Sequence, residues 1–372
     1  MNLTPSPFAP SEFPKLPAVG GVQAATASRG FYAGRGLERD DVFLFQFAPG
    51  TTCAGVFTSS STASADVQWC RDALKNGAGH GAALVVNSGN SNAFTGPKGA
   101  LKNEATLAAM VAALSVDKDQ CFLAATGVIG EPLDDANYVG SIVPKLASEL
   151  IEPDWEACAR AFMTTDTFPK GAGFVRKIDG VPTTFSGIAK GSGMIAPNMA
   201  TMLAYVFTDA AIAPDLLDAA LREACAQSFN AITVDSDTST SDSLMVFATG
   251  ANGAAIIETD ADPRFAAFTS ALNEICLELA LQIVKDGEGA SKFITIAVEG
   301  AASQESARTI AADIANSPLV KTALAANDPN WGRVFMATGK SGEPIDQNPL
   351  PISLPATPVT AYGSRADDSH AS

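Results

Sequence analysis

Thr201 is the residue whose surroundings best suit covalent chemistry. It directly follows the small residue Ala200, near the end of a glycine-rich stretch that runs from Ala189 to Leu203. A threonine hydroxyl in such a pair can attack the preceding carbonyl and shift the acyl group from nitrogen to oxygen, which leaves an ester that water splits. The freed threonine then carries a nucleophile and an amine base on one residue. This pattern indicates a self-cleaving bond between Ala200 and Thr201.

Two other interpretations of the same stretch follow from its residues. A glycine-rich turn that leads into a buried strand over 202–207 would have this composition without any catalytic role. The run from Gly191 to Ala196 also approaches the dinucleotide-binding fingerprint, but Pro197 and then a strand follow it. Because that fingerprint needs a strand–turn–helix unit, nucleotide binding is disfavoured. This stretch alone does not decide between a structural turn and a catalytic role for Thr201, and motifs elsewhere in the chain are needed.

Composition excludes several classes of partner. The 372 residues are 47% hydrophobic, enough for one large core or two moderate ones. The net charge of −16 and the pI of about 4.5 argue against binding to nucleic acid or to anionic membranes. Neither a signal-peptide pattern nor an apolar run of about 18 residues is seen, so we expect no membrane span and a cytoplasmic protein.

Histidine and cysteine chemistry is also disfavoured. Of the two histidines, His80 lies among glycines in a turn-like segment and His370 is close to the end of the sequence. The base of an acyl-transfer site in this chain is therefore not expected to be histidine. The cysteines are far apart and form no CxxC pair, which predicts reduced, buried thiols rather than a zinc ribbon or a disulfide scaffold. They are Cys53, Cys70, Cys121, Cys158, Cys225 and Cys276.

A run of acidic and hydroxyl residues extends from Asp235 to Asp242. It resembles half of a calcium-binding loop, but the glycine and the closing glutamate are absent at the required spacing. We therefore expect a capped turn there and no metal site.

Hydrophobic periodicity predicts alternating strands and helices without a regular βαβ rhythm, which favours an α/β sandwich over a doubly wound sheet. The clearest expected strands are residues 81–87, 121–125, 202–207, 231–234, 243–249 and 293–298. The clearest expected helices are residues 100–114, 215–228, 264–284 and 304–315.

Several loops together resemble one family, the ornithine acetyltransferases of arginine biosynthesis. The resemblance covers roughly residues 15–343 and rests on six motifs that occur in the family's order, with a seventh, Asn87–Ala93, that also fits. The six are residues 126–130 (TGVIG), 164–170 (TTDTFPK), 190–203, 237–240 (DTST), 286–290 (DGEGA) and 328–333 (DPNWGR).

This resemblance implies a layered α/β sandwich of the self-cleaving type that the family shares with a group of aminopeptidases. It implies acetyl transfer from N-acetylornithine to glutamate without a cofactor; some members also accept acetyl-CoA. It further implies an α chain over residues 1–200, a β chain from residue 201 to 343, and an assembly of two α and two β chains. The processed bond would join Ala200 to Thr201.

The resemblance also implies roles for individual residues. Thr126 and Gly127 match the family's oxyanion-hole pair. Lys190 and Glu288 match substrate contacts, and their two charges suit a free amino acid. One threonine of the Thr164–Thr165 pair matches a further contact, and we favour Thr164. Thr201 would act both as nucleophile and as a substrate contact.

The C-terminal part departs from the family pattern as read from the sequence. Residues 344–372 are rich in proline, and we expect them to be a disordered tail outside the family, as in a truncated or frameshifted form. Two C-terminal substrate contacts of the family would then be missing. A smaller departure is Ser236, where the family pattern has glycine. An inactive relic and an aminopeptidase on the same fold are the alternatives to an active acetyltransferase.

Overall fold

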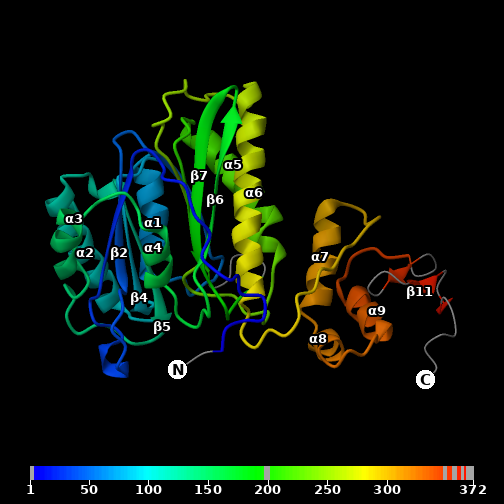
Figure 1. The fold of residues 1–372 in the computed structure, drawn as a ribbon. Helices are drawn as coiled ribbons and strands as arrows, with labels where there is room; N and C mark the ends of the chain where they lie inside the picture. The colour runs from blue at the N-terminus through cyan, green and yellow to red at the C-terminus, as the bar shows by residue number, and fades with distance from the viewer. Residues whose placement is uncertain (1–3, 197–201, 347–349, 354–357, 362–363, 366–372) are drawn as a thin grey trace. The chain divides into compact units, whose positions relative to one another are not determined.

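The computed structural model describes residues 4–196, 202–346, 350–353, 358–361 and 364–365 (Figure 1). The chain divides into two compact units, Met1–Gly289 and Ala290–Ser372. The first unit contains both large sheets, and it holds every described residue to which the sequence assigns a role in chemistry.

The first sheet has four strands in the order β1-β2-β4-β5. They are β1 (Val22–Ala27), β2 (Val42–Phe47), β4 (Ala83–Asn90) and β5 (Cys121–Val128). The β4 and β5 strands run parallel, whereas β2 is antiparallel to both β1 and β4. Polar side chains at the carboxyl ends of β4 and β5 therefore share one edge of this sheet.

The second sheet has five strands in the order β3-β9-β8-β7-β6. They are β3 (Thr52–Phe57), β6 (Lys170–Ile178), β7 (Val181–Lys190), β8 (Leu203–Thr208) and β9 (Ser243–Ala248). The β8 and β9 strands are parallel, and β7 is antiparallel to β8. Lys190 at the end of β7 is thus paired with Leu203, and Leu203 with Ser243 of β9, so that three segments meet at one edge.

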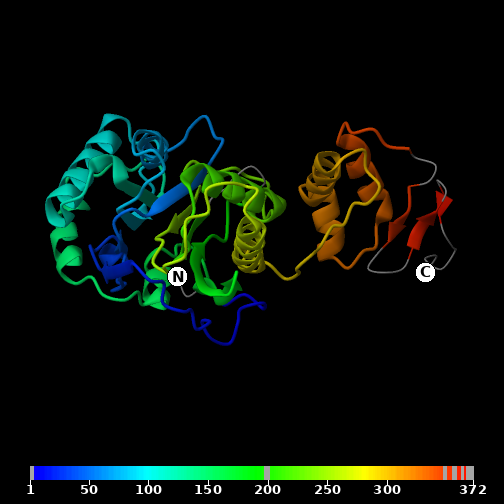
Figure 2. The same cartoon turned by 90° about the horizontal axis from the view of Figure 1, so that it is seen from above.

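Helices cover the outer faces of the two sheets, which gives a layered αββα unit (Figures 1 and 2). Helices α2 (Pro97–Leu114) and α3 (Val143–Ser148) pack on the first sheet, and α5 (Pro214–Gln227) and α6 (Pro263–Lys285) on the second. Helices α1 (Ala65–Asn76) and α4 (Trp155–Ala161) contribute to the core between the sheets. The expected layered α/β sandwich is confirmed.

Aromatic side chains hold the two sheets together. The Phe207 ring of β8 lies 4.6 Å from the Phe45 ring of β2, centroid to centroid, and 5.3 Å from the Trp155 indole. The Phe47 ring stacks 4.2 Å from that of Phe247. Such rings bury large apolar areas and gain from their offset and edge-on geometries, so they fix the spacing of the sheets.

Helix α6 is long and apolar enough to cross a membrane by length and composition alone. Its buried residues, among them Leu272, Ile275 and Leu279, belong to the core cluster that covers the second sheet. A core helix has this composition for the same reason as a membrane span, because most of it avoids water.

The second unit contains helices α7 (Gln304–Ala315), α8 (Pro318–Ala325) and α9 (Trp331–Lys340). They surround a small cluster of Ile310, Ile314, Val320 and Ala337. Three short strands, β10 (Ile352–Ser353), β11 (Pro358–Ala361) and β12 (Ser364–Arg365), follow within the segment expected to be a disordered tail.

Two expected strands are wrong. Residues 231–234 follow the short 3₁₀ turn Phe229–Ala231, and the Val234 N–H bonds the Ile195 carbonyl in a loop contact rather than in a ladder. Residues 293–298 belong to no strand that the structure describes. In both segments β-branched residues supplied the expected pattern, but a strand also needs a paired neighbour. The long β6–β7 hairpin was not predicted.

We expect Phe207→Ala to lower the free energy of unfolding by about 3–5 kcal/mol, because it opens a cavity between the two sheets. Leu101→Ala on α2 is the control, since the Leu101 side chain is 58% exposed. Chemical denaturation of both variants measures the difference. Equal stability of the two variants would contradict the role given to the intersheet rings.

Candidate active site

Thr126 and Lys190 meet between the two sheets. Thr126 lies near the carboxyl end of β5, and Lys190 is the last residue of β7. The Lys190 Nζ donates a hydrogen bond of 3.0 Å to Thr126 Oγ1, and both side chains are buried. Because the ammonium occupies an acceptor site of the hydroxyl, the Thr126 O–H remains able to donate in another direction.

Gly127 follows at a position that only glycine can occupy. Its φ is +131°, and a Cβ atom there would lie 2.4 Å from the carbonyl carbon of Gly89. Gly89 is its register partner on β4 and itself has a φ of +101°. The two glycines let the ends of β4 and β5 approach closely and leave the Gly127 backbone exposed beside the buried Thr126.

The Asn87–Ala93 segment builds structure at this end of β4. Asn92 Nδ2 donates to Asp66 Oδ2 at 2.7 Å and to Asn103 Oδ1 at 3.0 Å. Lys102 completes the buried cluster with an ion pair of 2.8 Å to Asp66. The amides of this motif therefore anchor the loop to α1 and α2.

Asp166 connects the 164–170 loop to the end of β7. Its Oδ1 accepts the Lys170 ammonium at 2.6 Å and the Gly191 N–H at 2.7 Å, and its Oδ2 accepts the Thr164 N–H at 3.0 Å. Burial alone would raise the pKa of Asp166, but the ammonium groups of Lys170 and Lys190 hold it below its ordinary value. Asp166 is therefore a buried carboxylate whose two oxygens are both occupied.

Asp286 closes the same network from the end of α6. Its Oδ2 accepts the Lys170 ammonium at 2.6 Å and the Thr167 N–H at 2.9 Å, and its carbonyl accepts the Ser192 hydroxyl at 2.6 Å. Lys170 thus lies between two carboxylates, with all three side chains fully shielded from solvent. This buried ion network joins the loops that contain Thr164, Gly191 and Glu288.

Glu288 is held close to the glycine-rich loop. Its N–H donates to the Ser192 carbonyl at 3.0 Å. A Cβ atom on Gly193 would lie 2.5 Å from Glu288 Oε1, so a larger residue there would push this carboxylate aside. Glu288 is exposed and still acts electrostatically on the buried Lys190. A negative and a positive group of the site are therefore close enough to interact.

Asp235 and Asp242 hold the two sides of the segment that contains Thr201. Asp235 Oδ1 accepts the Ile195 N–H at 2.9 Å, and Asp242 Oδ1 accepts the Met202 N–H at 2.7 Å. Ser236, where a glycine was expected, has a φ of +72°, and Met194 has a φ of +60°. Such values are unfavourable for residues with side chains, so these loops store backbone strain.

Relatives of known name share this sequence over nearly its whole length. The model of the ArgJ family matches residues 24–372. The arginine biosynthesis bifunctional protein ArgJ of Bradyrhizobium diazoefficiens is 50% identical over 99% of this chain and 88% of its own length. The protein of that name from Rhizobium meliloti is 49% identical over 98% of this chain and 88% of its own.

The chain belongs to the ArgJ family. It is accordingly an acyltransferase of arginine biosynthesis, as the resemblance implied. The matched range also includes residues 344–372, which the sequence alone had set apart from the family. Among solved structures, an ornithine acetyltransferase of Mycobacterium tuberculosis complexed with ornithine is 29% identical over 48% of this chain and 93% of its own, with a TM-score of 0.41.

The site residues expected from the sequence divide into two groups. Thr126, Gly127, Lys190 and Glu288 are brought together by the contacts given above, and Thr164 joins them through Asp166. Thr165 is exposed, whereas Thr164 is partly buried. Ala200 and Thr201 lie outside the described residues, although Met202, which directly follows Thr201, is held by Asp242.

Sequence reasoning missed the residues that assemble this ArgJ-family site. Asp166 and Lys170 stand in a motif that was recognised, and Asp286 in another, yet no role was given to them. Asp166 and Lys170 are four residues apart in a segment that was not expected to be helical, so no contact between them was predicted. Asp286 is 116 positions away from Lys170, and nothing in the sequence links the two. Lysine and aspartate are rarely buried unless they pair with each other, so their burial would have indicated an ion pair. The sequence alone does not show that these residues are buried.

All six cysteines are buried and none is joined in a disulfide bond, as predicted. Burial raises the pKa of Cys70 and of Cys121 to about 12, so that neither is a thiolate near neutral pH. Among the described residues no cluster of metal-ligating side chains is found. The thiols are therefore core residues rather than nucleophiles.

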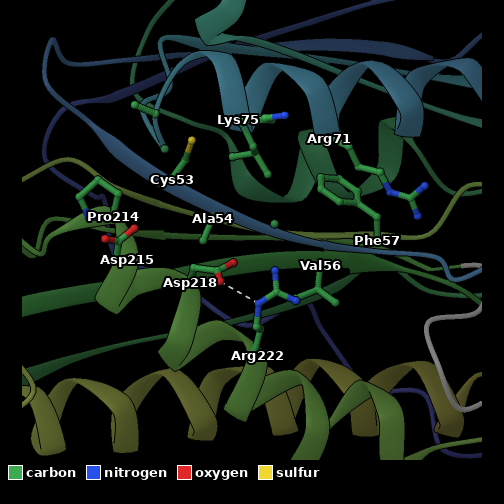
Figure 3. Close-up of a pocket in the computed structure, with 14 residues that line it drawn as sticks. Cys53, Ala54, Val56, Phe57, Arg71, Lys75, Pro214, Asp215, Asp218 and Arg222 are labelled. Atoms are coloured by element: carbon green, nitrogen blue, oxygen red, sulfur yellow. Dashed lines mark hydrogen bonds and ion pairs between the residues drawn. The ribbon is translucent and has the colours of Figure 1, made fainter.

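A cavity of about 580 Å³ lies elsewhere in the first unit, between β3, α1 and α5 (Figure 3). Arg222 on its wall is paired with Asp218 at 2.7 Å, and Arg71 donates to the carbonyl of Thr58. None of the lining residues belongs to the network around Thr126 and Lys190. We assign no function to this cavity.

We expect Lys170→Met to lower the free energy of unfolding by about 3–5 kcal/mol, because it leaves Asp166 and Asp286 buried without their cation. Lys118→Met is the control, since Lys118 pairs with Glu104 in an exposed position where an ion pair contributes little. Denaturant titration measures both variants. Comparable shifts in the two would show that the buried ion network is not what stabilises these loops.

Proposed function

We propose that this chain transfers an acetyl group from N2-acetylornithine to glutamate through an acetyl ester on Thr201. The observation that carries the proposal is the contact between Lys190 and Thr126. It lies where β7 pairs with the first residue of β8, two residues after Thr201 in the sequence. Membership of the ArgJ family supports the reaction, because its relatives are named for arginine biosynthesis.

The nucleophile forms in this proposal by self-cleavage between Ala200 and Thr201. Residues 1–200 then make an α chain, and a β chain begins with Thr201. The free amine of Thr201 serves as the base for its own hydroxyl during acetyl transfer. The glycine-rich stretch and the positive φ values of Met194 and Ser236 in the neighbouring loops support this proposal.

Thr126 and Gly127 stabilise the oxyanion of the tetrahedral intermediate. The Lys190 ammonium donates to Thr126 Oγ1 and so directs the Thr126 proton toward another acceptor. The backbone N–H of the exposed residue Gly127 beside it supplies the second donor. Donors held in place before the reaction stabilise charge as it develops, and no reorganisation is needed.

Substrate charges are matched by Glu288 and Lys190. The exposed Glu288 carboxylate binds the side-chain ammonium of ornithine, and the further N–H groups of Lys190 bind a substrate carboxylate. Thr164, whose N–H is held by Asp166, contributes a hydroxyl. The same site takes ornithine and glutamate in turn, because both carry an amino-acid head group.

Further features of the family enter this proposal. The relatives are called bifunctional, and we assign acetyl-CoA as a second acetyl donor to glutamate. The reaction uses no cofactor. We propose an assembly of two α and two β chains in the cytoplasm, where the buried thiols stay reduced.

Self-cleavage is tested by mass spectrometry under denaturing conditions. The wild-type protein should separate into residues 1–200 and a chain that begins with Thr201, and Thr201→Ala should remain a single chain. The alanine variant has no hydroxyl to attack the Ala200 carbonyl. A folded wild-type protein that stays uncut would overturn the proposed nucleophile.

Thr126→Ala should lower the rate of acetylornithine-to-glutamate transfer by about a hundredfold or more, because it deletes a donor that acts mainly in the transition state. KM should change far less than kcat. Thr259→Ala is the control, since Thr259 is exposed and is not among the residues assigned to the site. A Thr126→Ala enzyme with wild-type kcat would mean that Thr126 only ends a strand.

A further inference from the structure

Asp242 stands immediately before β9, at the edge where the segment after Thr201 enters the sheet. Because β8 and β9 are parallel and Leu203 is paired with Ser243, Met202 and Asp242 are neighbours across the two strands. The Ser243 N–H donates to the Met202 carbonyl at 3.1 Å, and the Met202 N–H donates to Asp242 Oδ1 at 2.7 Å. The Asp242 carboxyl is thereby fixed one residue away from the proposed nucleophile.

The second carboxyl oxygen of Asp242 is unusual. Oδ2 is buried, and it has no hydrogen-bond partner in the described part of the chain. The residue as a whole has no exposed surface. A buried polar atom without a partner costs free energy, so such an atom next to a reactive segment points to a role in chemistry.

Burial raises the pKa of Asp242 well above its ordinary value, although the Met202 N–H and the Lys190 ammonium lower it in part. Lys190 of β7 is the charged group that acts on Asp242 from the neighbouring strands. Since Oδ1 accepts a hydrogen bond, the proton of the neutral acid resides on Oδ2. Asp242 can therefore both give and take a proton at this oxygen.

Self-cleavage has a requirement that the later acetyl transfer does not have. Before cleavage the nitrogen of Thr201 is part of an amide, so it cannot act as the base that it becomes afterwards. The hydroxyl of Thr201 must lose a proton, and its nitrogen must gain one as the bond to the Ala200 carbonyl carbon breaks. Another group has to carry that proton.

Other candidates for this role are already occupied. Both oxygens of Asp166 accept hydrogen bonds, as do both oxygens of Asp286, and each carboxylate is paired with Lys170. His80 is half-buried and bridges Thr52, which pairs with Ala248 at the other end of β9. The Lys190 ammonium donates to Thr126. Glu288 is exposed, so among the buried carboxyl groups described at this edge Asp242 is the one with an oxygen to spare.

We propose that Asp242 is a catalytic residue of self-cleavage and carries the proton from the hydroxyl to the nitrogen of Thr201. The Thr201 oxygen forms a bond to the Ala200 carbonyl carbon, and the carbon–nitrogen bond breaks. The Asp242 carboxyl donates its proton to the leaving nitrogen and takes up the hydroxyl proton, so it ends as it began. Water then hydrolyses the ester to a carboxylic acid and the free hydroxyl. This inference rests on the proposed function.

The test compares the full-length chain with Asp242→Asn after cell-free synthesis. An asparagine keeps an oxygen for the Met202 N–H but cannot carry the proton. Processing should slow by about a hundredfold or more. Asp209→Asn is the matched control: Asp209 is also buried and accepts the Thr184 N–H at 2.7 Å, at the opposite end of β8.

Three further measurements separate a proton carrier from a structural aspartate. Asp242→Glu should recover part of the processing rate. Hydroxylamine, which cleaves esters and not amides, should fail to cut Asp242→Asn, because no ester has formed. The wild-type rate should fall as pH rises through the raised pKa of Asp242, since the neutral acid is the active form. A rate that is flat or rises with pH would overturn the proposal even where Asp242→Asn does not fold.

The outcomes for the two proposals are distinct. The role of Asp242 alone would be overturned if Asp242→Asn were processed at the wild-type rate while Thr201→Ala stayed uncut. A folded wild-type chain that never processes would overturn self-cleavage and with it this role. Slow processing of Asp242→Asn with normal processing of Asp209→Asn would support it.

Discussion

The buried pairing of Lys170 with Asp166 and Asp286 is the interaction on which the site depends. A charge without a partner is costly in a protein interior, so these three side chains must stay together. Asp166 also accepts the Gly191 N–H after the end of β7, and Asp286 accepts the Thr167 N–H of the 164–170 loop. The ion network therefore determines the distance between the 164–170 loop, the end of β7 and the loop that carries Glu288, although none of its members needs to touch a substrate.

Burial shifts the pKa values of two titratable groups near the proposed nucleophile in opposite directions. It lowers the pKa of Lys190 and raises that of Asp242, and the charges of Asp166 and Lys190 respectively oppose these shifts. Groups whose environments favour the neutral form exchange protons more readily near neutral pH than exposed ones do. The edge of the second sheet is thus suited to proton transfer in a chain that offers no histidine for this task.

Strand direction explains why residues from distant parts of the sequence meet here. Thr126 and Gly127 lie just before the end of the parallel pair β4–β5, and the parallel pair β8–β9 begins at Leu203 and Ser243. The antiparallel β7 brings Lys190 to that beginning. The aromatic core then fixes the spacing of the sheets, so that the lysine of one reaches the threonine of the other.

The sequence by itself determined the chemistry and much of the fold. An acyl-transfer site was indicated by the small residue before Thr201, by the scarcity of histidine and by the family resemblance of the TGVIG and DGEGA motifs. Hydrophobic periodicity indicated an α/β sandwich. These signals could be recognised because each is local in the sequence. Only the tertiary structure decided what Asp166, Lys170, Asp286 and Asp242 do. Their roles depend on burial and on partners in other strands, and a linear pattern of polar residues contains neither. For the same reason residues 231–234, with a strand-like composition, form the end of a turn and a loop, because no strand that the structure describes pairs with them.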